Sequence, residues 1–306
     1  METKVEDPTS FLAAWAEIME RPSMLPPLRV DNVTPDPEKT PLRPISSKEI
    51  KKYLPPLSTA AGPDGFGPGD LRAVPTSVVK VLLTLFMLRG RLPVCLSGAR
   101  TIFVPKKAGA SDPGDFRPIT ISSVLVRLFH KVLANRLLGT IDFDFRQRAF
   151  LPVDGCAENV FSLAGVLYEA RRRYRHLHMA TLDVAKAFDS VTIDAILEGL
   201  RRKGMAEDFV AYIESFYRSA TTVLTYNGMT HTVHPSRGVR QGDPLSPLLF
   251  NLILDHWLRN LQEGVAFRSA RATSRFGYRG VLVPSKAAKQ DASRLGKSPQ
   301  QAFGGG

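Results

Sequence analysis

Cysteine is scarce in this chain of 306 residues, because only Cys95 and Cys156 occur, far apart and outside any Cys-x-x-Cys pair. We therefore expect neither a disulfide framework nor a cysteine-based zinc site. The six histidines show no spacing typical of metal ligands. Long apolar runs are missing too: the most apolar stretch, residues 78–88, contains Lys80 and is shorter than the ~20 residues that a membrane span needs.

The start of the chain lacks the basic segment and apolar run that mark a secretory signal. We therefore expect an intracellular protein, nuclear or cytoplasmic, that has no membrane partner. Acidic residues number 29 against 41 basic ones, which gives a formal net charge of +12. This balance favours a polyanionic partner such as nucleic acid, although basic residues are often only a solvated surface.

The N-terminal leader, residues 1–56, contains one short amphipathic stretch at 11–19, which predicts a helix. A proline-rich stretch follows from residue 22 to residue 56, and such a composition favours extended and turn conformations. We interpret the leader as a tether or a surface wrap without a core of its own. The 43% of hydrophobic residues in the chain is ample for a core elsewhere.

Helical and strand-like patterns alternate through the middle of the chain, which predicts an α+β fold with helices packed on an antiparallel sheet. Strand-like runs end near residue 105 and resume at 116–119, and residues 221–226 and 229–233 flank Asn227-Gly228, a strong hairpin signal. The aromatic stripe at 209–217 is interpreted as packed core. Apolar side chains recur at helical spacing in segments 76–88, 125–136, 160–175, 193–204 and 209–217.

Three sequence blocks carry a resemblance that covers roughly half of the chain. LDVAKAFDSV (182–191) resembles the first catalytic palm motif of reverse transcriptases from non-LTR (LINE-type) retrotransposons, and RGVRQGDPLSPLLFNLILD (237–255) resembles their next palm motif. VPKKAGASDPGDFRPITISSVLVRLFHKVLANRL (104–137) is similar to their fingers block. The resemblance implies the fingers and a partial palm of a right-hand polymerase.

The same resemblance implies a site for nucleotide addition by two metal ions, Mg²⁺ with Mn²⁺ as the alternative. Asp183 would be the catalytic carboxylate and a metal ligand, with the Val184 carbonyl beside it, at the end of a strand formed by residues 179–184. Taken alone, an aspartate such as Asp183 is more often a loop acid that makes turn or cap hydrogen bonds, and the surrounding motif reverses that expectation. The deoxynucleoside triphosphate would be bound by Lys106, Arg117, Phe188, Gln241 and Gly242; a packed core ring is the alternative for Phe188.

An RNA template and a DNA primer are the implied nucleic-acid partners. The candidate contacts are arginines in two segments, and cations at the end of a helix are favourable even without nucleic acid. In the loop before the second palm motif, Asp243 and Pro244 are expected to start a helix. The candidate arginines are Arg171, Arg172, Arg173, Arg175, Arg237 and Arg240.

The paired aspartates of the family's third motif are absent after Asp255, where the only acids are Glu263 and Asp291. We therefore expect a truncated or frame-shifted copy that is a reverse transcriptase by descent but inactive as this chain, and an artefact of the gene model is the equal alternative. A non-catalytic nucleic-acid-binding remnant and a poorly folding fragment are the alternatives. The expected organisation is the 1–56 leader, fingers with part of the palm at 57–178, palm core at 179–262, and a divergent disordered tail at 263–306.

Overall fold

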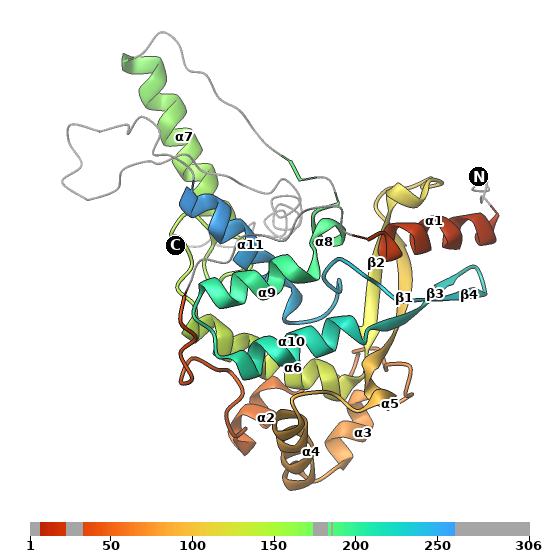
Figure 1. The fold of residues 1–306 in the computed structure, drawn as a ribbon. Coiled ribbons are helices and arrows are strands. Elements are labelled where there is room, and N and C mark those ends of the chain that lie inside the picture. The colour runs from red at the N-terminus through yellow and green to blue at the C-terminus, as the bar shows by residue number, and fades with distance from the viewer. Residues whose placement is uncertain (1–6, 23–32, 174–182, 185, 261–306) are drawn as a thin grey trace, which may run out of the picture. The chain divides into compact units, whose positions relative to one another are not determined.

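The computed structural model describes residues 7–22, 33–173, 183–184 and 186–260 (Figure 1). The predicted strand residues 179–182, Arg175 and the predicted tail 263–306 lie outside these ranges. The chain divides into two compact units, one formed by Met1–Asp142 with Lys186–Ile253 and one by Phe143–Ala185 with Leu254–Gly306. We describe each unit by itself.

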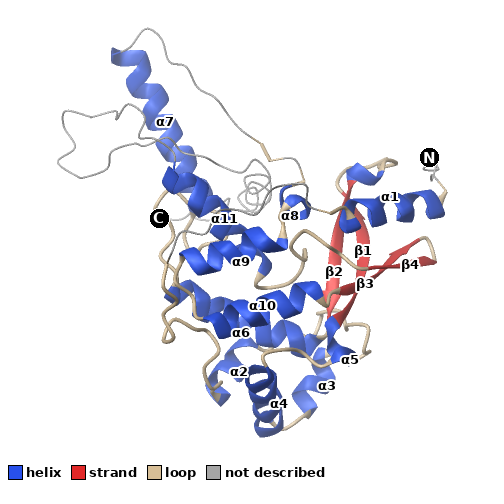
Figure 2. Ribbon diagram, in the orientation of Figure 1, coloured by secondary structure: helices blue, strands red, loops and turns tan. Residues whose placement is uncertain are grey.

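The first unit combines one sheet with packed helices, which confirms the predicted α+β class (Figure 2). Its described elements are α1 (Pro8–Glu20), α2 (Ser47–Tyr53), α3 (Pro68–Ala73), α4 (Thr76–Arg89), α5 (Val94–Ser97), β1 (Gly98–Pro105), the 3-10 turn η1 (Pro113–Asp115), β2 (Phe116–Ser122), α6 (Val124–Thr140), α8 (Ala187–Ser190), α9 (Ile193–Arg202), α10 (Glu207–Arg218), β3 (Thr221–Tyr226), β4 (Met229–Val233) and most of α11 (Ser246–Asn260).

The four strands lie in the order β2-β1-β3-β4, and the predicted purely antiparallel sheet is wrong in one respect. The β1–β2 and β3–β4 hairpins are antiparallel as expected, but β1 and β3 are parallel, with Thr101 opposite Leu224. Parallel neighbours need a long crossover connection, and the chain from β2 to β3 passes through helices α9 and α10 before it returns. Asn227 and Gly228 both have positive φ, as the predicted tight turn requires.

Helix α1 packs against the sheet (Figure 2), which corrects the interpretation of the leader as a tether. The Phe11 ring stacks on Tyr226 at 3.9 Å between centroids and meets the Phe103 and Phe116 rings edge-on. Phe11 and Trp15 are four residues apart, so they lie on one face of the helix and are buried together. The described leader therefore shares the core of the first unit, because its aromatic side chains outweigh its proline-rich composition.

Arg136 of α6 holds the part of the leader from Pro41 to Glu49. The Arg136 guanidinium donates to Glu49 Oε1 at 2.8 Å and to Oε2 at 2.9 Å, and it also donates to the carbonyls of Pro41 and Pro44. Glu49 in turn accepts a hydrogen bond from the Ser46 amide in a capping box that starts α2. The hydrogen bond from Arg136 lowers the pKa of Glu49 to about 2.

Helices α4, α6, α9 and α10 follow the sequence pattern closely. Ser123 caps α6, because its hydroxyl accepts from the Leu125 amide at 3.2 Å, and Gly90 ends α4 in a left-handed conformation. The aromatic stripe of α10 is buried, which confirms its interpretation as core; its members are Phe209, Tyr212, Ile213, Phe216 and Tyr217.

The second unit contains α7 (Gly155–Arg173), the helix predicted at 160–175. Asp144 pairs with Arg146 at 2.8 Å, and hydrogen bonding to this guanidinium lowers the pKa of Asp144. Asp255 of α11 pairs with Arg259 at 2.9 Å. Within the described part of the chain, no helix is both long and apolar enough to span a membrane.

We expect Glu49→Gln to destabilise the protein by about 1–2 kcal/mol at pH 7, since the charged hydrogen bonds to Arg136 are lost and solvent screens the partly exposed pair. Because folding lowers the pKa of Glu49, this stabilisation is full above pH 4.5 and is lost as the pH falls toward 2. Chemical denaturation of both proteins between pH 7 and pH 3 measures the difference, which should shrink in acid. Glu38→Gln, in the same segment, is the control, and an equal effect of both variants would contradict the stabilising role of the contact between Glu49 and Arg136.

Candidate functional site

The loop from Arg237 to Asp243 is held from two sides. On one side the Gly238 and Val239 amides donate to the carbonyls of Val191 and Phe188, at 2.6 and 2.9 Å. On the other side the Thr120 amide of β2 donates to the Gln241 carbonyl at 2.7 Å. The loop thus connects the segment around α8 to the sheet, and it carries two of the predicted nucleotide-binding residues.

Gly242 makes the approach of this loop to β2 possible. Its φ is +118°, and a Cβ built on it would lie 2.6 Å from the Thr120 carbonyl oxygen. No side chain fits there, so the residue must be glycine for steric reasons. The neighbour that approaches this glycine so closely in the structure is strand β2.

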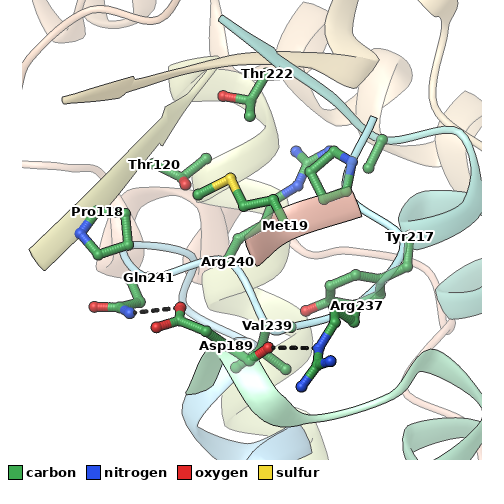
Figure 3. A pocket seen from close by; sticks show the side chains of 13 residues that line it. Met19, Pro118, Thr120, Asp189, Tyr217, Thr222, Arg237, Val239, Arg240 and Gln241 are labelled. Atoms are coloured by element: carbon green, nitrogen blue, oxygen red, sulfur yellow. Dashed lines mark hydrogen bonds between the residues drawn. The ribbon is translucent and has the colours of Figure 1, made fainter. Parts of the chain in front are cut away.

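Gln241 contacts an acid that the sequence analysis did not single out. Its Nε2 donates to Asp189 Oδ1 at 3.0 Å, and both residues line a cavity of about 40 Å³ together with Met19 and Thr120 (Figure 3). A cavity of this volume has room for a few water molecules and is too small for a nucleotide. Asp189 is the second acid of LDVAKAFDSV, which was the signal that could have found it.

Phe188 lies in the short helix α8, just after Lys186 with its left-handed φ of 47°. Its ring is half-buried and packs on Phe250 of α11 at 5.1 Å between centroids. The packed-ring reading of Phe188 therefore holds. Its predicted position beside a nucleotide sugar stays a prediction.

The prediction that Arg240 contacts nucleic acid is wrong, because its side chain is in the core. Arg240 is only 8% exposed, donates to the Ser97 carbonyl at 3.2 Å and lies 4.3 Å from the centroid of the Phe216 ring. Burial lowers the pKa of Arg240, and the nearby Asp243 carboxylate opposes that shift. The charge pattern of the sequence gave no sign that this arginine faces inward.

Arg237 also makes contacts within the protein. It donates through Nε to the Asp189 carbonyl at 3.1 Å (Figure 3), and its backbone forms an isolated bridge with Thr192. The side chain is half-buried, so its contact with nucleic acid stays a prediction.

The predicted fingers hairpin is present, and it brings Lys106 and Arg117 to neighbouring strand ends. Arg117 is opposite Val104, and the Lys106 amide donates to the Asp115 carbonyl at 2.8 Å. The Lys106 ammonium donates to the Gly114 carbonyl. Lys106 is exposed and Arg117 is half-buried. Their contact with a triphosphate stays a prediction.

Asp183 and Val184 belong to the second unit, where both are exposed and lie outside any strand or helix. The structure therefore does not place Asp183 in a strand, although residues 179–182 before it are outside the described ranges. Among the residues that the structure describes, no three side chains of the Asp, Glu, His and Cys types gather as a metal site would require.

The basic end of α7 is also in the second unit. Arg171 and Arg172 are exposed, and the Arg172 guanidinium lies 5.6 Å from the centroid of the Tyr168 ring. Arg173 is the last residue of the helix, and its side chain is outside the described part, like all of Arg175. Their nucleic-acid contacts stay predictions.

The sequence also gave no sign of a row of buried, hydrogen-bonded polar side chains beneath the loop. His130 Nδ1 lies 2.5 Å from Asp243 Oδ2, and His130 Nε2 lies 2.6 Å from the Tyr212 hydroxyl. Asp243 Oδ1 accepts from the Leu245 amide at 2.9 Å, so Asp243 caps a turn, and α11 begins at Ser246, later than predicted. His130 lies inside the fingers block, but apolar neighbours gave it no distinguishing signal.

Comparison with known proteins gives one family match, over residues 104–274, to the family described as reverse transcriptase (RNA-dependent DNA polymerase). The chain is 41% identical over 229 residues to the Retrovirus-related Pol polyprotein from type-2 retrotransposable element R2DM of Drosophila melanogaster, covering 74% of this chain and 22% of the relative.

Two further relatives are Retrovirus-related Pol polyproteins from type-1 retrotransposable element R2. The protein from Nasonia vitripennis is 44% identical over 74% of this chain and 22% of its own length. The protein from Bradysia coprophila is 35% identical over 85% of this chain and 30% of its own length. The chain thus spans less than a third of the length of these relatives.

We expect Gly242→Ala to destabilise the protein by at least about 2 kcal/mol, because the added Cβ would collide with the Thr120 carbonyl and the positive φ is strained. The free energy of unfolding from urea denaturation measures this change. Gly139→Ala in α6 is the matched control, since a Cβ there meets nothing within 4 Å and alanine favours the helix. Equal stability of Gly242→Ala and the native chain would show that the loop and β2 separate easily.

Proposed function

The chain belongs to the reverse transcriptases, among those of non-LTR retrotransposons, and on this premise we propose that it forms the fingers and part of the palm of an RNA-directed DNA polymerase. One observation carries the proposal. Within the first unit, the loop with Gln241 and Gly242 is bonded to the backbone of Phe188 on one side and of β2 on the other. Residues of all three resembling sequence blocks thus meet at one place.

In this proposal the fingers with part of the palm comprise residues 57–178 and the palm core comprises 179–262. The triphosphate is bound by Lys106 and Arg117 at the β1–β2 hairpin, because an ammonium and a planar guanidinium both suit phosphate oxygens. Gln241 and Gly242 face the base pair that forms, and the Phe188 ring borders the sugar. An RNA template and a DNA primer are the proposed partners.

Reverse transcriptases use divalent ions for nucleotide addition, and Asp183 with the Val184 carbonyl are the ligands that we propose from this chain for Mg²⁺, or for Mn²⁺. One carboxylate and one carbonyl cannot balance the four positive charges of two ions. Because the described residues do not gather a fuller ligand set, we derive no metal-dependent step from them. We propose that this chain by itself binds nucleotides without joining them.

A nucleic-acid-binding remnant is the second candidate, and the exposed Arg171 and Arg172 on α7 favour it. Their guanidinium groups can neutralise backbone phosphates, which makes binding depend steeply on salt. The burial of Arg240 removes one of the cations on which this candidate relied. The two candidates differ in whether a nucleoside triphosphate binds.

We expect the purified chain to bind a deoxynucleoside triphosphate, and Lys106→Ala or Arg117→Ala to weaken binding by about tenfold, since each removes a charge-assisted contact to phosphate. Isothermal titration calorimetry measures the Kd. Lys107→Ala is the control, because Lys107 lies in the same hairpin and pairs with Asp115 at 3.0 Å. A native chain that binds RNA but no triphosphate would favour the remnant instead.

In primer extension with an RNA template, a DNA primer and Mg²⁺, we expect no product from this chain alone. The reason is the single proposed carboxylate ligand, Asp183. Gel analysis of a labelled primer makes the measurement, with a full-length reverse transcriptase as positive control. Extension by the native chain that Asp183→Ala abolishes would overturn the proposed lack of activity and would support the proposed role of Asp183.

A further inference from the structure

A chain of buried polar groups leads from α10 through α6 to the loop at 237–243. The Tyr212 hydroxyl, both nitrogens of His130 and the Asp243 carboxylate are linked at 2.6 and 2.5 Å, and all three side chains are buried. A buried hydrogen bond to a charged group is among the stronger ones, and losing one partner leaves the other unsatisfied.

The proton positions along this row of hydrogen-bonded side chains follow from the groups at its two ends. Burial raises the pKa of Tyr212 well above its usual value, so the hydroxyl keeps its proton and can donate it to His130 Nε2. His130 then carries its proton on Nδ1 and donates it to Asp243. The charge of the nearby Asp243 carboxylate opposes the lowering of the Arg240 pKa by burial. One buried cation is thus balanced by one buried anion.

These two buried charges flank Gln241 and Gly242 in the sequence. Arg240 is fixed on the Ser97 carbonyl and the Phe216 ring, and Asp243 is fixed on His130. Capping the turn at Leu245 needs one acceptor atom only, and Asp243 Oδ1 provides it. The second oxygen, Oδ2, serves the contact with α6, so capping alone does not explain this acid.

We propose that His130 and Tyr212 are positioning residues that act through Asp243 and fix Gln241 and Gly242 in the geometry that nucleotide binding needs. The proposal rests on the proposed function for its consequence in binding, but the order of the loop can be measured without it. Tyr212 orients the imidazole, His130 transfers that orientation to the carboxylate, and the carboxylate fixes the end of the loop.

Two substitutions of His130 separate positioning from general stability. The side-chain amide nitrogen of asparagine falls near the place of imidazole Nδ1 and can donate to Asp243. The side-chain amide of glutamine reaches the place of Nε2, where its oxygen can accept from the Tyr212 hydroxyl. His130→Asn therefore keeps a donor for Asp243 and loses the contact with Tyr212, whereas His130→Gln does the reverse. Each variant breaks one buried hydrogen bond, so we expect similar losses in Tm from both.

Hydrogen–deuterium exchange of peptides covering residues 237–245 reads out the loop. We expect exchange in His130→Gln to be about tenfold faster or more, and exchange in His130→Asn to stay within about threefold of the native chain, since only the first loses the link to Asp243. Peptides from β1 and β2 should be unchanged in both. The Kd for a deoxynucleoside triphosphate should rise in the same order.

Tyr212→Phe is the milder variant if either histidine variant fails to fold. It removes one hydroxyl and keeps both the ring and the contact of His130 with Asp243, so we expect a measurable rise in exchange of the same loop peptides that stays within about threefold, as in His130→Asn. Tyr226→Phe is the control, because the Tyr226 ring packs on Phe11 of α1, and it should leave loop exchange unchanged.

Equal loop exchange in His130→Gln and His130→Asn, or native exchange in Tyr212→Phe, would overturn the proposal. If the loop opens as expected but the native chain binds no triphosphate, the proposed function fails and the positioning role stands. If the native chain binds a triphosphate but loop exchange does not change in the variants, the positioning role fails and the proposed function stands. The two proposals are therefore tested separately.

Discussion

The close approach of the 237–243 loop to β2 is the constraint on which the first unit depends. It is possible because Gly242 has no side chain where the Thr120 carbonyl oxygen lies. Thr120 is itself fixed from the sheet side, because its hydroxyl and that of Thr222 both bond to Thr101 across three neighbouring strands. The position of the loop is thereby fixed relative to the centre of the sheet. The other side of the loop is hydrogen-bonded to the carbonyls of Phe188 and Val191, at α8. Any relative movement of these segments would break several buried hydrogen bonds together.

Charge burial beneath the loop has a cost that a purely apolar core would avoid. Removing Arg240 and Asp243 from water is unfavourable, and their mutual attraction with a few hydrogen bonds only partly offsets it. The Phe216 ring faces the Arg240 guanidinium, and His130 and the Leu245 amide satisfy the Asp243 oxygens. Such groups specify one arrangement, because any shift of the loop would leave a buried charge without its partner. This loop therefore gains a defined conformation at the expense of stability.

Local patterns in the sequence were sufficient for most elements of this fold. The periodic apolar residues of α6 and α10, the Gly90 helix end and the Asn227-Gly228 turn each depend on residues close together in the chain, and each was predicted. What failed was long-range. The parallel pairing of β1 with β3, the packing of α1 on the sheet and the inward direction of Arg240 all depend on partners far away in the sequence. Rules based on composition assign arginine to the surface and proline-rich segments to tethers. Such rules do not include the residues, distant in the sequence, against which these groups pack.

The candidate site shows the same division. The resemblance located Phe188, Gln241 and Gly242 by motif, but only the fold shows what joins them. In the sequence, Phe188 and Gln241 are separated by α9, α10 and the β3–β4 hairpin. In the fold they are brought together, because the Val239 amide donates a hydrogen bond to the Phe188 carbonyl. Helix α10 supplies the Phe216 and Tyr212 side chains beneath the loop, and α9 packs so closely on α11 that a Cβ on Gly199 would lie 3.1 Å from Leu252. The precision of the loop is therefore a property of the helical core, since the residues that would touch a nucleotide are held by residues that never would.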